Sequence, residues 1–264
     1  MSVTAEQVGQ TFSQARASDQ PAPKVPWVYT IGLGIVVTVV VLIYRWFQQT
    51  HSFTVGLDYF EQAFQDTWMR LFYIQMSLIM LAGIIGVPAV WFTRERDLSA
   101  VTPQDELRRI YWVLSVAAVA SVLVVIALGL FVEADAAWHQ TTIRDTDFTP
   151  THIALFYFIL PAGFVGLIMG FVWIHTRIPY FANRVSVPLS VICLGLPLIM
   201  PNLGFNEWGH TFFYMEELFA APIHWGFVTL AWAFFCLSGF TVQCLARMRE
   251  LTTLPGQEKS ALPS

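Results

Sequence analysis

The stretch IYWVLSVAAVASVLVVIALGLF, residues 110–131, contains no charged side chain and decides the class of this fold. An α-helix needs about 20 predominantly apolar residues to cross the hydrocarbon core of a bilayer. Further uncharged apolar runs occupy about residues 27–44, 71–92, 153–174, 187–201 and 225–245. The sequence therefore predicts an all-α integral membrane protein with about six transmembrane helices.

The composition supports this class. Apolar residues make up 56% of the chain and charged residues 12%, with a mean hydropathy of +0.58. Soluble globular chains carry roughly a quarter charged residues, so an ordinary soluble domain is excluded. The cationic residues form no basic patch, which argues against a nucleic-acid partner. Cys193, Cys236 and Cys244 lie within apolar runs without a CxxC pattern, which indicates small buried hydrophobes.

Two of the apolar runs allow alternatives. The run 187–201 is short and contains Pro188, Pro197 and Pro201. It fits either a broken or tilted sixth span, or a re-entrant segment beside five spans. The first run is not preceded by a compact basic region or followed by a small-residue cleavage site, so we expect an uncleaved anchor.

The distribution of Lys and Arg predicts an orientation. We expect a mobile polar tail at residues 1–24, a transmembrane helical domain at 25–245 and a second tail at 246–264. With six spans, the side that holds both tails carries eleven of the basic residues and the other side three. Because basic residues accumulate on the cytoplasmic side, the tails are predicted to be cytoplasmic. The histidine-rich loops then face the periplasm or an equivalent lumen.

Apolar residues recur at spacings of three and four between the first and second runs. They are Phe53, Leu57, Phe60, Phe64, Trp68 and Leu71. This spacing is typical of an amphipathic helix. We expect it to lie at the outer membrane surface or against a partner before the chain enters the second span.

Asp135 and His139 are separated by three residues, which places both side chains on one helix face, one turn apart. His152 follows the Thr149-Pro150 pair, which breaks one helix and can begin the next. A carboxylate and two imidazoles are ligands that transition metals accept. Asp135, His139 and His152 are called the first set. The spacing alone equally fits an Asp–His ion pair beside an interfacial histidine.

A similar constellation follows later in the chain. Asn206 and His210 repeat the three-residue spacing, and His224 lies beyond them. Residues 204–227 contain no Lys or Arg, so the acids of this segment lack local cationic partners. This favours a metal or the cations of a partner protein. Asn206, His210 and His224 are called the second set, and the alternative is a group of interfacial histidines in an aromatic belt.

The apolar runs carry no charged side chain and no histidine in their interiors. Proton relays and ion paths usually place such groups deep in the membrane. This absence argues against a proton-coupled transporter and against a di-haem anchor with facing histidine pairs.

The blocks AWHQ (137–140), RDTDFTPTHI (144–153) and MPNLGFNEWGHTFFYMEELFAAPIHWGF (200–227) carry a resemblance to a known family. They resemble the C subunit of the copper membrane monooxygenases, which include particulate methane monooxygenase, ammonia monooxygenase and short-chain hydrocarbon monooxygenases. The resemblance extends from GLDYF at residue 56 to the end of the sixth apolar run. The two loop regions are specific, whereas the spans and tails diverge freely.

The resemblance implies that the first set binds copper and that the second set forms an adjacent copper site. It implies A and B partner subunits, usually as a trimer of heterotrimers in the membrane. The reaction would hydroxylate a small substrate with O2 and electrons from a quinol. RDTDFTP is more similar to the hydrocarbon-oxidising branch than to the ammonia branch, where Ser often replaces the second Asp. We therefore expect methane or another short alkane, with an ammonia-oxidising subunit or a non-catalytic scaffold subunit as alternatives.

Overall fold

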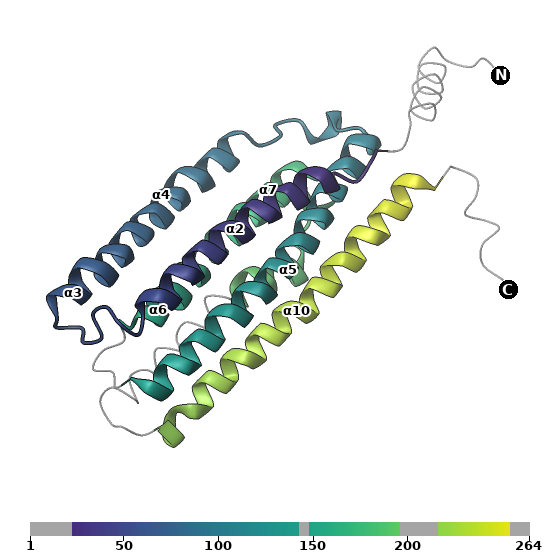
Figure 1. The fold of residues 1–264 in the computed structure, drawn as a ribbon. Helices are drawn as coiled ribbons and strands as arrows, with labels where there is room; N and C mark the ends of the chain where they lie inside the picture. Colours follow the sequence, from purple (N-terminus) through teal and green to yellow (C-terminus); the bar gives the residue numbers. More distant parts are fainter. Residues whose placement is uncertain (1–22, 143–147, 196–215, 254–264) are drawn as a thin grey trace, which may run out of the picture.

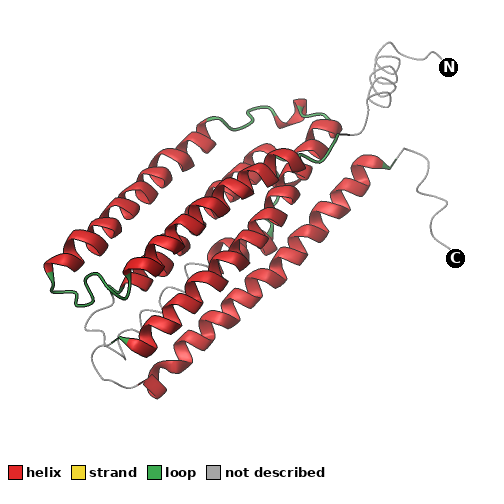
Figure 2. Cartoon of the chain, in the orientation of Figure 1, coloured by secondary structure: helices red, strands yellow, loops and turns green. Residues whose placement is uncertain are grey.

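The computed structural model describes residues 23–142, 148–195 and 216–253, the last range with side chains from Ala231 onward. Its helices are α2 (Trp27–His51), α3 (Gln62–Phe64), α4 (Arg70–Phe92), α5 (Pro103–Thr141), α6 (Pro150–Ala154), α7 (Leu160–Arg177), α8 (Pro179–Ala182) and α10 (Glu216–Thr252). A π-helical turn at Gln65–Met69 joins α3 to α4, and another at Leu155–Ile159 joins α6 to α7. A 3-10 turn at Leu98–Ala100 precedes α5. Within the described ranges every regular element is helical (Figure 2).

The long helices form a membrane bundle. Figure 1 shows α2, α4, α5, α7 and α10 running alongside one another. The described residues contain 5 helical segments that are long and apolar enough to cross a membrane. This confirms the predicted all-α integral membrane protein. The apolar run 187–201 is helical over residues 187–195, and its remainder lies outside the described residues. α10 continues to Thr252, past the predicted end of the membrane domain at residue 245.

Side-chain caps define where the central helices begin. Thr102 accepts a hydrogen bond from the backbone N–H of Asp105, and Pro103 occupies the first turn of α5. Thr149 caps α6 in the same way, ahead of Pro150. A hydroxyl cap before a proline satisfies one free N–H and fixes the first turn, so both sequences start a helix at a defined residue.

The amphipathic pattern over residues 53–71 differs from the predicted surface helix. Residues 53–61 form turns, and continuous helix begins only at Gln62 and runs on into α4. Gly56 has a φ of +59°, a conformation that favours glycine and turns the chain. Phe64 and Trp68 are buried inside the bundle. The helical part of the pattern therefore faces the core, whereas Phe53, Leu57 and Phe60 are exposed in the preceding turns, which corrects the expected continuous amphipathic helix.

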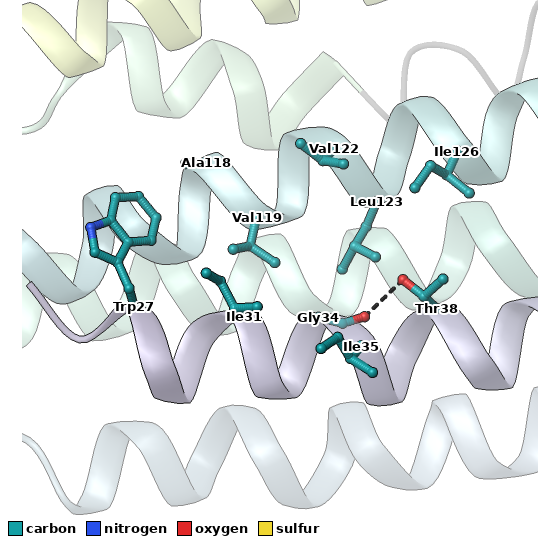
Figure 3. Close-up of a pocket in the computed structure, with 10 residues that line it drawn as sticks. All are labelled: Trp27, Ile31, Gly34, Ile35, Thr38, Ala118, Val119, Val122, Leu123 and Ile126. Atoms are coloured by element: carbon teal, nitrogen blue, oxygen red, sulfur yellow. Dashed lines mark hydrogen bonds between the residues drawn. The ribbon is translucent and has the colours of Figure 1, made fainter.

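Packing pairs α4 with α7, and α5 with both α2 and α10. α2 and α5 run in the same direction and approach closely at Gly34, where an added Cβ would lie 2.6 Å from Val119 Cγ1. Beside this contact is an apolar groove of about 330 Å³ between the two helices (Figure 3). Thr38 lines the groove, and its hydroxyl donates a hydrogen bond to the Gly34 carbonyl at 2.8 Å.

An ion pair between Glu106 and Arg247 connects helices at the end of the bundle where α5 begins. Glu106 is buried there and accepts hydrogen bonds from Arg247 Nε at 3.0 Å and Arg247 Nη2 at 2.8 Å. The backbone N–H of Tyr180 donates to the same carboxylate at 3.1 Å. This pairing holds the C-terminal part of α10 against α5 and α8, at the opposite end of the bundle from Asp135 and His152.

Candidate metal centre

The first set comes together where α5 ends and α6 begins. Asp135 and His139 occupy successive turns near the C-terminus of α5, as their three-residue spacing predicts. His152 lies in the first turn of α6, where its backbone N–H donates to Thr149 Oγ1 at 3.0 Å. The predicted helix start at Thr149-Pro150 is confirmed, and His152 in its first turn faces the other two residues.

The ligand atoms of the three residues form a compact triangle. Nε2 of His139 lies 2.9 Å from Nε2 of His152. Oδ1 of Asp135 lies 3.1 Å from Nε2 of His139 and 3.3 Å from Nε2 of His152. Atoms that bind one metal ion at about 2.0–2.1 Å, at angles near 90–110°, are about 2.8–3.4 Å apart. All three edges fall in this range, so the spacing of the ligand atoms is compatible with a single bound metal ion.

Among the described residues, Asp135, His139 and His152 form a group of acidic and histidine side chains that could hold a metal ion. We call them the triad. Two imidazoles with one carboxylate form a donor set used by zinc, non-haem iron and copper. The triad thus meets both the chemical and the geometric requirement for a metal site.

The surroundings of the triad are buried on one side and open on the other. His152 is 1% exposed and its ring packs against Phe156, with ring centroids 4.7 Å apart. The side chains of His139 and Asp135 retain 25% and 18% exposure. A bound metal would therefore be shielded on the His152 side and reachable on the His139 side.

Hydrogen bonds orient the triad from neighbouring residues. Thr151 Oγ1 donates to Asp135 Oδ1 at 2.6 Å and lies 3.1 Å from Thr149 Oγ1. Trp138 is 1% exposed, and its Nε1 donates to the carbonyl oxygen of Ser52 at 2.8 Å. That bond fixes the end of α5 to the end of α2. Groups that hold a ligand's neighbours in this way commonly tune metal affinity.

The remaining predicted residues lie in different parts of the chain. Asn206 and His210 lie outside the described residues. His224 belongs to α10, in the part of that helix where only the backbone is described. The second set therefore stays a prediction. His175 lies at the opposite end of the bundle, where Nδ1 contacts the Phe171 carbonyl at 2.9 Å and Nε2 accepts from Ser186 N–H at 3.3 Å.

Sequence reasoning missed several residues that support the triad. Thr151 stands next to His152 in the first helical turn, and Trp138 stands next to His139. Gln75 lies within the apolar run 71–92, and an amide within such a run signals a buried hydrogen-bond partner. That signal was readable in the sequence, although the identity of the partner was not.

The chain also matches a known protein family over most of its length. The matching family model describes the C subunit of ammonia monooxygenase/methane monooxygenase, and the match covers residues 11–254. A search of curated proteins gave no match.

Proposed function

The chain belongs to the family of C subunits of ammonia monooxygenase and methane monooxygenase, and from this premise we propose that its triad binds copper within a membrane monooxygenase complex. The observation that carries the proposal is the triangle of Asp135 Oδ1, His139 Nε2 and His152 Nε2, whose edges measure 2.9, 3.1 and 3.3 Å. Bound copper would supply the one-electron and O2 chemistry of hydroxylation.

The residues of the chain have separate roles in this proposal. The two imidazoles and the carboxylate hold the metal. Thr151 keeps Asp135 Oδ1 turned towards the imidazoles through the 2.6 Å hydrogen bond. Phe156 and the buried face of His152 exclude water from one side, which strengthens electrostatic interactions there. The exposed edge of His139 leaves an approach for O2, substrate or a partner protein.

We also propose that Asn206, His210 and His224 form a second copper site. The support is their composition, since two imidazoles and an amide oxygen repeat the donor types of the triad with one less charge. Its place in the reaction belongs to the whole complex.

The proposed reaction hydroxylates a small substrate with O2 and two electrons delivered by a quinol. Methane or another short alkane is the favoured substrate, on the RDTDFTP block at residues 144–150. An ammonia-oxidising subunit is the alternative, and turnover of the purified complex with each substrate separates the two.

We propose A and B subunits as partners, assembled as a trimer of heterotrimers in the bacterial inner or intracytoplasmic membrane. In support, α2 and α4 expose large apolar side chains along their length, including Val28, Ile35, Leu78 and Ile84. Such surfaces are stable only against lipid or other helices. Both tails are proposed to be cytoplasmic, with the triad on the periplasmic or lumenal side.

Labelling tests the orientation. A cysteine placed at Gln140, beside the triad, should react with an impermeant thiol reagent in intact cells, whereas one at Ser99 should react only after lysis. The reverse pattern would refute the proposed topology.

Metal analysis of the intact complex tests the copper proposal. The complex is purified in native lipid, its metals are quantified, and anomalous scattering at the copper edge locates them. Copper is expected at the triad, and His139→Ala and His152→Ala should each lose that copper together with most activity. His175→Ala, at the opposite end, should keep both.

Three outcomes would overturn the proposal. Iron or zinc at the triad would replace copper as its metal. Loss of triad copper with full activity would make the chain a scaffold for a metal-bearing partner. Equal loss in all three variants would show general destabilisation instead of a ligand role.

A further inference from the structure

A chain of two hydrogen bonds, one partly buried and one buried, links α2, α4 and α6 beside the triad. Tyr44 Oη donates to Gln75 Oε1 at 2.8 Å, and Gln75 Nε2 donates to the carbonyl oxygen of Ile153 at 2.6 Å. Gln75 is 4% exposed, and Ile153 is fully buried. The chain of bonds ends on the residue that directly follows His152.

The two bonds fix the orientation of the Gln75 amide. If the amide were reversed, its oxygen would lie against the Ile153 carbonyl oxygen, and two acceptors would face each other. The Tyr44 hydroxyl supplies the hydrogen that the amide oxygen needs, so the NH2 group is directed to Ile153. The Ile153 carbonyl, which can only accept, therefore sets the direction of the Gln75 amide, and the Tyr44 hydroxyl holds the amide there by donating to Oε1.

The Ile153 carbonyl lies at an irregular point of the backbone. The π-helical turn Leu155–Ile159 begins two residues later. Such turns change the hydrogen-bond register of a helix and recur at functional sites. Thr149 holds the N–H of His152 on one side and Gln75 holds the carbonyl of Ile153 on the other. The backbone that carries the His152 ring is thus fixed on both sides.

A second bond reaches the other half of the triad from the same helix. Trp138 precedes His139 and donates to the carbonyl of Ser52, the residue that follows α2. Tyr44 belongs to α2 itself. The end of α2 therefore connects through one bond to the neighbour of His139 and through two bonds to the neighbour of His152.

We propose that Gln75, held by Tyr44, is a positioning residue of the metal centre: it sets His152 against Asp135 and His139 through the Ile153 carbonyl. This inference rests on the proposed metal function of the triad. If these groups were exposed, water could replace a lost hydrogen bond at little cost. Gln75 and Ile153 are buried, so the loss of their bond is not compensated in this way. Groups beyond the direct ligands commonly change metal affinity by about 10–100-fold when removed.

The test uses Gln75→Met in the whole complex in native lipid. Methionine keeps the length of the side chain and removes both hydrogen-bonding groups. Copper retention is measured in a titration with a copper chelator, and the copper(II) electron paramagnetic resonance spectrum is recorded. We expect the variant to lose triad copper at a chelator concentration about 10-fold lower than the wild type needs, and its copper(II) spectrum to change.

Conservative and remote variants separate positioning from stability. Gln75→Glu should restore the spectrum, because a neutral buried carboxyl can donate to Ile153 and accept from Tyr44. Gln243→Met is the matched control, since the Gln243 amide accepts the Ser186 hydroxyl at 2.6 Å at the opposite end of the bundle. It should leave copper retention and spectrum unchanged. If Gln75→Met fails to assemble, Tyr44→Phe removes only the hydroxyl that holds the Gln75 amide oxygen and should change the same spectrum.

The failures of the two proposals are distinguishable. If His139→Ala and His152→Ala leave copper content and spectrum unchanged, the triad is not a copper site. If they remove copper while Gln75→Met and Tyr44→Phe keep the wild-type spectrum and retention, the positioning role is refuted and the copper site stands. Failure of Gln75→Glu to restore the spectrum, with the complex assembled, also refutes the hydrogen-bonding role.

Discussion

Replacing Trp138 with Phe should loosen the metal centre from the α5 side. The change removes the indole N–H and leaves the Ser52 carbonyl, in a residue that is 2% exposed, without its donor. An unpaired buried acceptor costs about 1–3 kcal/mol, and the smaller ring adds about 1 kcal/mol of lost packing. We expect a stability loss of about 2–4 kcal/mol and easier loss of triad copper.

Trp68 offers a matched control for this change. Its indole is fully buried and its Nε1 donates to the Val55 carbonyl at 2.8 Å, the same type of bond at the same length. It packs in a cluster with Ile153 at the same end of the bundle, although its own sequence neighbours are not ligands. Because Val55 is only partly buried, Trp68→Phe should lose somewhat less stability than Trp138→Phe, and it should change copper retention less.

The assay compares both variants in lipid nanodiscs. Thermal unfolding reports the stability loss, and chelator titration with metal analysis reports copper retention. Trp138→Phe should release copper at a chelator concentration about 10-fold lower than the wild type needs. Equal copper loss in both variants would attribute the effect to general loosening, and unchanged retention in Trp138→Phe would refute the anchoring role of the indole.

Three further changes test other contacts. Thr151→Val should lower triad metal affinity about 10-fold by removing the 2.6 Å hydrogen bond to the triad carboxylate, whereas Thr141→Val, whose hydroxyl bonds to the α5 carbonyls of Ala137 and Trp138, should not change it in a chelator titration. Glu106→Ala should destabilise the assembled protein by about 1–3 kcal/mol, because Arg247 and the Tyr180 N–H lose a buried acceptor while Arg247 keeps Glu250 as a partner; unchanged thermal unfolding would contradict this. Gly34→Ala should cost about 1–3 kcal/mol by forcing α2 from α5, whereas Gly32→Ala, with nothing within 4 Å, should be neutral in the same measurement.

The sequence allowed the helices and the triad to be predicted because their determinants are local. Uncharged runs define spans, a three-residue spacing defines a helix face, and Thr149-Pro150 defines a helix start. These features act within a few residues, so they can be read without knowing the packing. The observed cap at Thr149 and the observed triangle agree with that reasoning.

The supporting residues could not be predicted because they depend on helix rotation and register. Tyr44 and Gln75 belong to different helices, and Gln75 and Ile153 are 78 positions apart. No spacing rule relates them. The same ambiguity explains the pattern around Trp68, because apolar residues at spacings of three and four fit a core-facing helix as well as a surface one.

These polar contacts are important because lipid, not water, surrounds the helices. Between membrane helices the hydrophobic effect supplies little attraction, since lipid is as apolar as a leucine side chain. Many apolar side chains of α2 and α4 are accordingly exposed to the surroundings of the chain. Helix rotation must then be fixed by packing and by hydrogen bonds between helices. At the triad, those bonds start from Tyr44, Gln75 and Trp138 and end on residues next to the ligands. The order of the metal centre is therefore expected to depend on a few buried donors more than on the burial of apolar surface.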